Sequence, residues 1–180
     1  MNRKLIVLAA AAATACTAIA LNVVPASGQV SHPAAATAVT TNASGSVLGS
    51  THFLTLAAAR KAADVALANC AGRGFPVAVA VLDRDGVLIF QERADTATGA
   101  TVNVSMEKAY AAVGFQSPTS ALQQAAVTQP GFTSIAGFNI LPGGLPISIN
   151  GTVVAGIGVS GSPSGDTDAL CATAGINAIS

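Results

Sequence analysis

The chain has 180 residues, of which 51% are apolar, 9% are charged and 4% are aromatic. A charged fraction so far below the usual value of about 25% excludes disorder driven by charge, and the length suits one domain behind an export segment. The formal net charge is zero. Six of the basic residues are scattered between Arg60 and Lys108 instead of forming a stripe, which argues against a nucleic-acid binder.

The first 28 residues have the pattern of a signal peptide. Two basic residues precede an apolar run at 5–21, and Ala26 and Gly28 satisfy the small-residue rule of signal peptidase. We therefore predict cleavage near Ala26 or Gly28 and a secreted or extracytoplasmic protein. An uncleaved membrane anchor is an alternative, because the run approaches the length that spans a bilayer. A lipoprotein attached at Cys16 is another.

Residues 29–50 are mostly Ala, Thr, Ser, Gly and Asn without periodicity, a composition that predicts a flexible tether. A folded domain is expected over 51–180. It begins with an amphipathic helix, because small and apolar residues recur at spacings of three and four up to Cys70. Thr55 is the expected N-cap of this helix, and Gly72 ends it.

A hairpin and two helices are expected next. Two runs rich in β-branched residues, 75–82 and 87–91, are joined by an Asp-Arg-Asp-Gly turn, which is typical of a hairpin. Because the first run is apolar on both faces, its strand is expected to be central and covered on both sides. An apolar stripe over 106–113 predicts a helix, and Ser117 as N-cap with Pro118 in the first turn predicts a short second one.

The last part of the domain predicts a second hairpin and a final helix. Asn150-Gly151, a strong hairpin signal, separates the apolar runs 147–149 and 153–159. A polar start at 164–168 then introduces a helix that reaches Ile176. Hairpins separated by helices predict an α+β fold, with a central antiparallel sheet flanked by helices.

The cysteines allow two interpretations. If cleavage removes Cys16, Cys70 and Cys171 remain as an even pair in an oxidising compartment, where a disulfide is expected if the first and last helices are neighbours. Two buried thiols are the alternative. No cluster of Cys and His suggests a structural zinc site.

The Gly-Ile-Gly-Val-Ser-Gly segment at 156–161 matches a dinucleotide-binding fingerprint only by its letters. That fingerprint requires a following helix and an acid about 20 residues later, whereas these glycines interleave with apolar residues inside a strand. We interpret them as positions where a backbone or a ligand approaches closely. Neither this segment nor the serines after it form a recognisable hydrolase motif.

Four segments and one acid, in this order, carry a specific resemblance. They are Ser-Met-Glu-Lys-Ala at 105–109, Gly-Gly-Leu-Pro at 143–146, Asn-Gly at 150–151, the glycine-rich segment at 156–161, and Asp168. Together they resemble the GlcG/HbpS family, also called the haem-degrading domain family, from about Thr55 to Ile179. The resemblance implies a profilin-like α/β/α sandwich that forms homo-oligomers. The export signal favours the secreted HbpS-like branch, whose members bind haem and can modulate a membrane sensor kinase.

A haem site requires apolar walls, a cation for the propionates and an axial donor. The helix stripe supplies Met106 and Tyr110, and Lys108 is a candidate partner for a propionate. The resemblance suggests that an oxygen of Thr119 binds the iron. His52 is chemically the stronger ligand, although a lone histidine near a tether is more often simply exposed.

Two acidic positions receive separate interpretations. Asp168 is expected to serve the start of the last helix, with ligand contact as the alternative. The secreted branch also has an acidic iron-binding pattern of two close glutamates, and here Glu92 lacks an obvious partner in sequence. Binding of iron at such a surface site is therefore not expected.

The leading hypothesis is a secreted protein that sequesters haem and signals to a membrane sensor. The alternatives are an enzyme that degrades haem or acts on a small organic acid, with Lys108 and Asp168 as its charged groups, and a structural oligomer with another small-molecule ligand. A binding protein is favoured over an enzyme because the sequence shows no nucleophile with a matching base.

Overall fold

The computed structural model describes residues 50–180, so the predicted signal peptide and nearly all of the predicted tether lie outside it. No helix among the described residues is both long and apolar enough to cross a bilayer. The elements, in chain order, are α1 (Leu56–Gly72), β1 (Ala78–Asp83), β2 (Leu88–Arg93), α2 (Ala100–Gly114), α3 (Thr119–Ala126), the 3-10 helix η1 (Pro130–Ser134), β3 (Gly144–Ile149), β4 (Thr152–Ser160) and α4 (Gly165–Asn177).

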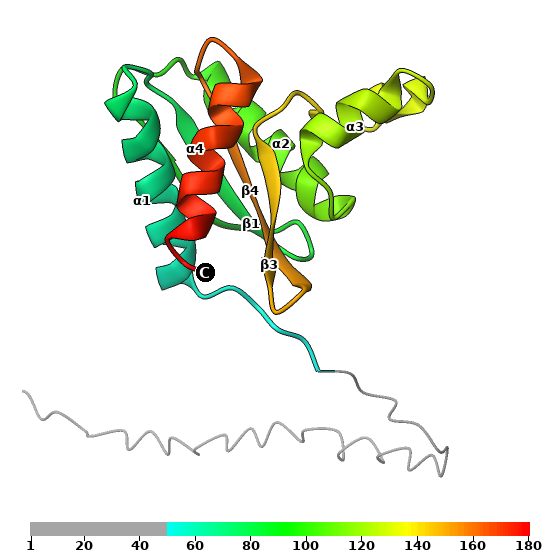
Figure 1. Cartoon of the computed structure of the whole chain (residues 1–180), viewed down its shortest axis with the longest axis horizontal. Helices are drawn as coiled ribbons and strands as arrows, with labels where there is room; N and C mark the ends of the chain where they lie inside the picture. The colour runs from blue at the N-terminus through cyan, green and yellow to red at the C-terminus, as the bar shows by residue number, and fades with distance from the viewer. Residues whose placement is uncertain (1–49) are drawn as a thin grey trace, which may run out of the picture. The chain divides into compact units, whose positions relative to one another are not determined.

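The four strands form one antiparallel sheet in the order β2-β1-β4-β3. Helices α1 and α4 lie side by side on one face, and α2 covers the other face (Figure 1). The predicted α+β sandwich is therefore confirmed. β1 is a central strand, as expected: Val79 and Val81 pack toward α1 and α4, whereas Ala80 and Leu82 pack toward α2.

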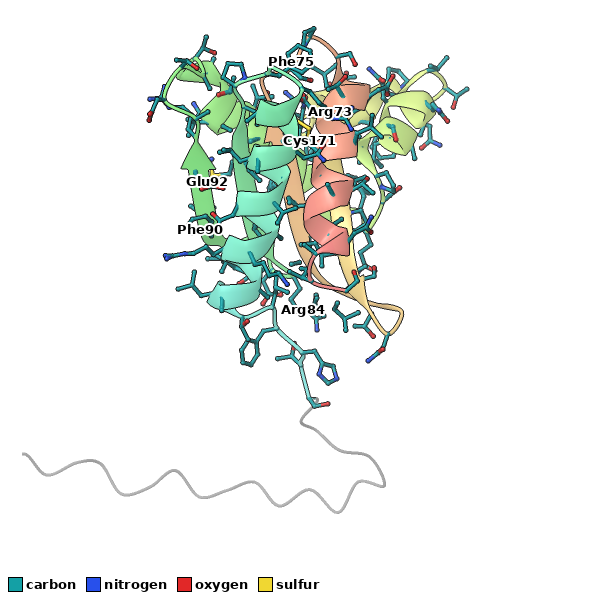
Figure 2. All side chains as sticks on the ribbon, turned by 60° about the vertical axis from the view of Figure 1, so that its left-hand side comes forward. Arg73, Phe75, Arg84, Phe90, Glu92 and Cys171 are labelled. Carbon is teal, nitrogen blue, oxygen red and sulfur yellow. A yellow bond between two sulfur atoms is a disulfide. The ribbon has the colours of Figure 1, made fainter. Side chains whose placement is uncertain are left out.

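Small residues allow α1 and α4 to approach each other closely. Ala62 and Ala66 of α1 are fully buried, and a side chain at Gly175 of α4 would overlap the carbonyl oxygen of Ala62. A disulfide between Cys70 and Cys171, with Cα atoms 5.6 Å apart, joins the two helices (Figure 2). The interpretation as a disulfide is thus the correct one of the two that the sequence left open.

Glycines set the distance between the sheet and α2. A Cβ atom at Gly156 of β4 would lie 2.6 Å from the carbonyl oxygen of Ala109, and one at Gly158 would overlap the carbonyl oxygen of Ser105. The helix backbone therefore packs directly on β4. This confirms that the glycines at 156–161 serve close backbone approach.

The N-cap predicted at Thr55 is present, the polar start predicted at 164–168 contains a second N-cap, and the N-cap predicted at Ser117 is wrong. The hydroxyl of Thr55 accepts a hydrogen bond from the N–H of Ala58, and the hydroxyl of Ser164 accepts one from the N–H of Thr167, each at 3.2 Å. Ser117, however, does not cap α3, whose N-cap is Pro118. The N–H of Ser117 instead donates to the carbonyl of Ala112 at 3.1 Å, so this residue closes the end of α2.

Candidate functional site

The five residues predicted to bind a ligand lie in three separate places. Met106 and Tyr110 share one pocket, Lys108 and Thr119 are buried beside the start of β3, and His52 lines a second pocket. We call the first the Tyr110 pocket and the second the His52 pocket. The β1–β2 and β3–β4 turns contribute to them and lie at the same end of the sheet, because Asp83 pairs with Ala155.

The Tyr110 pocket encloses about 320 Å³ between the β1–β2 turn, α2 and the chain before β3. Its lining residues are Leu82, Asp85, Gly86, Leu88, Met106, Glu107, Tyr110 and Gly137. Met106 and Tyr110 come together because residues four apart share one face of a helix. The sequence therefore correctly grouped these two side chains, although it missed the turn residues that complete the pocket.

The ring of Tyr110 is held between two turns. Gly86 and Gly137 both have positive φ angles, and a Cβ atom at Gly86 would overlap the ring, whereas one at Gly137 would lie 3.6 Å from it. Phe138 adds an edge-on contact, with ring centroids 5.0 Å apart. Tyr110 remains 38% exposed, so its ring forms a fixed wall that a ligand can reach.

Lys108 lies at the other end of the sheet, where it is only 2% exposed. Its Nζ donates to Oδ2 of Asp168 at 2.9 Å and to the carbonyl of Val159 at 3.0 Å. The remaining oxygen of Asp168, Oδ1, accepts from the N–H of Ser162 at 3.1 Å. Asp168 lies in the first turn of α4, as the sequence predicted, and in addition it joins α4 to α2 through Lys108.

Gly143 and Gly144, at the start of β3, make room for this arrangement. Gly143 has φ +124°, and a Cβ atom there would lie 2.9 Å from Nζ of Lys108 and 2.8 Å from Cβ of Asp168. Gly144 lies against the backbone of Lys108 in the same way. The Gly-Gly segment that carried the family resemblance is thus explained by the buried ion pair.

Thr119 is fully buried at the first turn of α3. Its hydroxyl accepts a hydrogen bond from the N–H of Gly144 at 3.0 Å and lies 3.3 Å from the carbonyl oxygen of the same residue. These contacts tie α3 to β3. Binding of iron by Thr119 remains a prediction, and it would require the hydroxyl to leave Gly144.

The His52 pocket encloses about 230 Å³ beside the segment that leads into α1. Its lining residues are His52, Phe53, Leu54, Ile149, Asn150, Thr152 and Val154. Arg84 of the β1–β2 turn, labelled in Figure 2, donates to the hydroxyl of Thr51 at 2.8 Å, and Thr51 immediately precedes His52. Sequence reasoning missed Arg84, because only the tertiary fold brings that turn to residue 51.

Glu92 lies between the edge strand β2 and α1. Its Oε1 is buried without a hydrogen bond in the described structure. Burial raises the pKa of Glu92 above its ordinary value of 4.5, and so do repulsion by Asp64 and a hydrogen bond that protonated Glu92 donates to Asp64, whereas Arg60 lowers it. Glu92 thus has an acidic neighbour on α1 that the sequence did not reveal. No group of three or more His, Cys, Asp or Glu residues among positions 50–180 could hold a metal ion.

Comparison with known proteins identifies the same family as the sequence motifs do. The family model described as "Haem degrading protein HbpS-like" matches residues 54–177. The crystal structure of a double mutant of Streptomyces reticuli HbpS has 38% sequence identity and a TM-score of 0.73, and the match covers 78% of this chain and 96% of that one.

Two further matches extend the comparison. An uncharacterized 15.0 kDa protein from the dhaT–dhaS intergenic region of Citrobacter freundii is 34% identical over 116 residues, which is 60% of this chain and 80% of that protein. A crystal structure of a PduOC–haem complex has 21% identity and a TM-score of 0.65, covering 71% of this chain and 96% of that one. At that identity the similarity shows a shared fold alone.

Proposed function

This chain belongs to the HbpS-like family of haem-degrading proteins, and from that membership we propose that it binds haem in the His52 pocket. The observation that carries the choice of site is an imidazole that lines a pocket together with apolar side chains, while the guanidinium group of Arg84 bonds the residue before it. Of the chain's two histidines, only His52 lies among the described residues.

The residues of this pocket meet the chemical requirements of haem. His52 supplies an axial nitrogen, which is a common donor to haem iron. Phe53, Ile149 and Val154 supply apolar surface, and Arg84 supplies the cation for a propionate. When bound, haem would contribute the redox chemistry of its iron, while the protein holds and shields it.

The small volume of the His52 pocket favours a haem site that a second copy of the chain completes. A volume of about 230 Å³ is below the 300–1,000 Å³ typical of ligand pockets, so one copy of the chain would cover only part of the macrocycle. Phe53, which lines the pocket, is 73% exposed, and Leu56, three residues further along the chain, is 54% exposed. These observations support the proposal that the protein forms homo-oligomers, in which a second copy covers the haem. Light scattering with and without hemin measures this, and a monomer under both conditions contradicts it.

The decisive experiment is a titration of the purified protein with hemin, followed through the Soret band. We expect saturable binding that weakens about tenfold or more in His52→Ala, because the axial donor is lost. His32→Ala is the matched control and should bind like the parent protein. An increase that never saturates would contradict haem binding altogether.

The same titration separates the site from its alternatives. Thr119→Ala tests the threonine oxygen that the family resemblance suggested, and Tyr110→Phe and Met106→Leu test the other pocket. If one of these variants loses affinity while His52→Ala does not, haem binds in this protein but not in the His52 pocket.

We also propose that the protein is exported and reports haem to a membrane sensor kinase. The Cys70–Cys171 disulfide supports export, because such bonds persist mainly in oxidising compartments. The mass of the exported protein would show whether cleavage occurs near Ala26 or Gly28. The sensor proposal rests on the resemblance to the secreted branch, and a haem-dependent change in the activity of a co-reconstituted kinase would test it.

An enzymatic function receives less support from the structure. Lys108 and Asp168, the charged groups of that alternative, are 2% and 3% exposed and bonded to each other. Neither group is accessible to a substrate in this conformation. Binding is therefore the function that the geometry supports best.

A further inference from the structure

The Tyr110 pocket has a composition different from that of a haem site, and we propose that it binds a small organic cation with an apolar body, such as an aryl or alkyl ammonium. This pocket and the His52 pocket share no lining residue. The proposal therefore does not depend on whether the protein binds haem.

The Tyr110 pocket has the size and the apolar walls that a small molecule requires. Its volume of about 320 Å³ lies in the range of pockets that hold small molecules. Leu82, Leu88 and Met106 provide apolar walls, and the two glycines beside Tyr110 contribute no side chain that would fill the space. A ligand there would remove apolar surface from water on several sides.

The charges of the pocket all have the same sign. Asp85 and Glu107 are its only charged lining residues. Among the described residues the ion pairs are Arg84–Asp85 and Lys108–Asp168, so Glu107 forms none. Arg84 balances Asp85 only weakly, because the atoms Nε and Oδ1 are 3.9 Å apart and the two side chains are 45% and 80% exposed. A cation on the ligand would complement Glu107.

Tyr110 adds a second attraction for a positive charge. A quaternary or protonated amine within about 6 Å of an aromatic face is attracted by the ring quadrupole. The ring is held in place by Gly86, Gly137 and Phe138, so little order is lost when a ligand stacks on it. A hydrated metal ion would gain nothing from the apolar walls, and haem propionates would meet two carboxylates.

The chain offers a direct probe of this pocket. It contains one tyrosine and no tryptophan, so the fluorescence of tyrosine in the protein is that of Tyr110. We would titrate the purified protein with benzyltrimethylammonium and follow this fluorescence, with calorimetry in parallel. Benzyl alcohol and phenylacetate are the neutral and anionic comparison ligands.

We expect a saturable change with benzyltrimethylammonium, weaker binding of benzyl alcohol and the weakest binding of phenylacetate. Glu107→Gln should lower affinity for the cation about fivefold, because one partly exposed carboxylate contributes modestly. Asp166→Asn, which removes an exposed carboxylate on α4, is the matched control and should change nothing. Circular dichroism would confirm that both variants are folded.

Four outcomes would overturn the proposal. The first is equal affinity for the three ligands, which indicates an apolar patch without charge selection. The second is an unchanged affinity of Glu107→Gln for benzyltrimethylammonium. The third is saturable heat without a change in Tyr110 fluorescence, which would place the cation elsewhere. The fourth is no saturable change in either heat or fluorescence, which would exclude binding of the cation.

Discussion

The two faces of the sheet are held to their helices by different means. Under α1 and α4, a large cluster of small apolar residues is buried and a disulfide joins the helices. Under α2, the buried apolar cluster contains only Ala80, Leu82 and Ala109, with Met106 at its edge. There the helix backbone packs on Gly156 and Gly158, and the Lys108–Asp168 ion pair links α2 to α4 around the end of the sheet.

The packing of α2 leaves two of its side chains free to line a pocket. The space between the sheet and the α1–α4 pair is filled mainly by apolar side chains, whereas α2 needs little apolar volume because it contacts β4 through backbone atoms. Met106 and Tyr110, which lie on α2 beside the β1–β2 turn, are therefore free to line a pocket. The comparison predicts that the first face depends most on its covalent bond and the second on its ion pair.

Removal of the disulfide should have the largest effect. The bond joins residues 101 positions apart, and a loop of about that length contributes up to roughly 4–5 kcal/mol through the entropy of the unfolded chain. We expect the double variant Cys70→Ser, Cys171→Ser to lose most of this stability in urea unfolding. Cys16→Ser in the full-length chain is the control and should unfold like the parent protein. Equal stability of both variants would mean that the bond does not constrain the unfolded chain.

Disruption of the ion pair should have the next largest effect. Lys108→Ala would leave the Asp168 carboxylate buried without its cation, which costs roughly 3–5 kcal/mol in comparable cases. Lys61→Ala, at an exposed lysine of α1, should cost only a few tenths of a kcal/mol. If Lys108→Met combined with Asp168→Leu is less stable than Lys108→Ala alone, burial of an unpaired charge is not the cause.

Substitution of Glu92 by Gln should have the smallest effect on stability and, unlike the two changes above, should stabilise the protein near pH 7. Its pKa in the folded protein is raised, chiefly by burial and then by Asp64, so the folded state holds the proton more tightly than the unfolded chain. Stability should therefore fall as the pH rises from about 4.5 through the folded-state pKa. Glu92→Gln should remove this dependence and stabilise the protein near pH 7 by a few tenths of a kcal/mol, since solvent screens a partly exposed group.

Urea unfolding of the parent protein and of Glu92→Gln at several pH values measures this effect. Asp64→Asn should produce a smaller gain, because it removes the repulsion but leaves Glu92 buried. If Glu92→Gln is less stable than the parent protein near pH 7, the carboxylate has a stabilising partner and the interpretation is wrong.

Much of the fold could be predicted because its signals are local. Thr55 and Ser164 cap helices through N–H groups three residues away, and Asn150-Gly151 adopts the positive φ angles that a tight hairpin requires. The expected cap at Ser117 was wrong for an equally local reason. The chain after α2 turns at Gln116, whose φ is +50°, and this commits the N–H of Ser117 to α2.

The candidate sites were less predictable, because most of their contacts join distant parts of the chain. Met106 and Tyr110 could be grouped since helical spacing places them on one face. Both Lys108 and Asp168 were recognised as notable residues, yet nothing in their sequence positions indicated that they bond each other. The same holds for Arg84 beside Thr51 and for Glu92 beside Asp64.

The sequence by itself thus determined the order and types of the elements, the apolar central strand and the glycines that mark close approach. Only the tertiary structure decided that Cys70 meets Cys171, that Lys108 is paired with Asp168, and that two pockets of different charge lie at the same end of the sheet. The physical reason is the range of the interactions. Caps, turns and periodicity act over a few residues, whereas ion pairs and pockets depend on which faces of the helices and sheet are packed together.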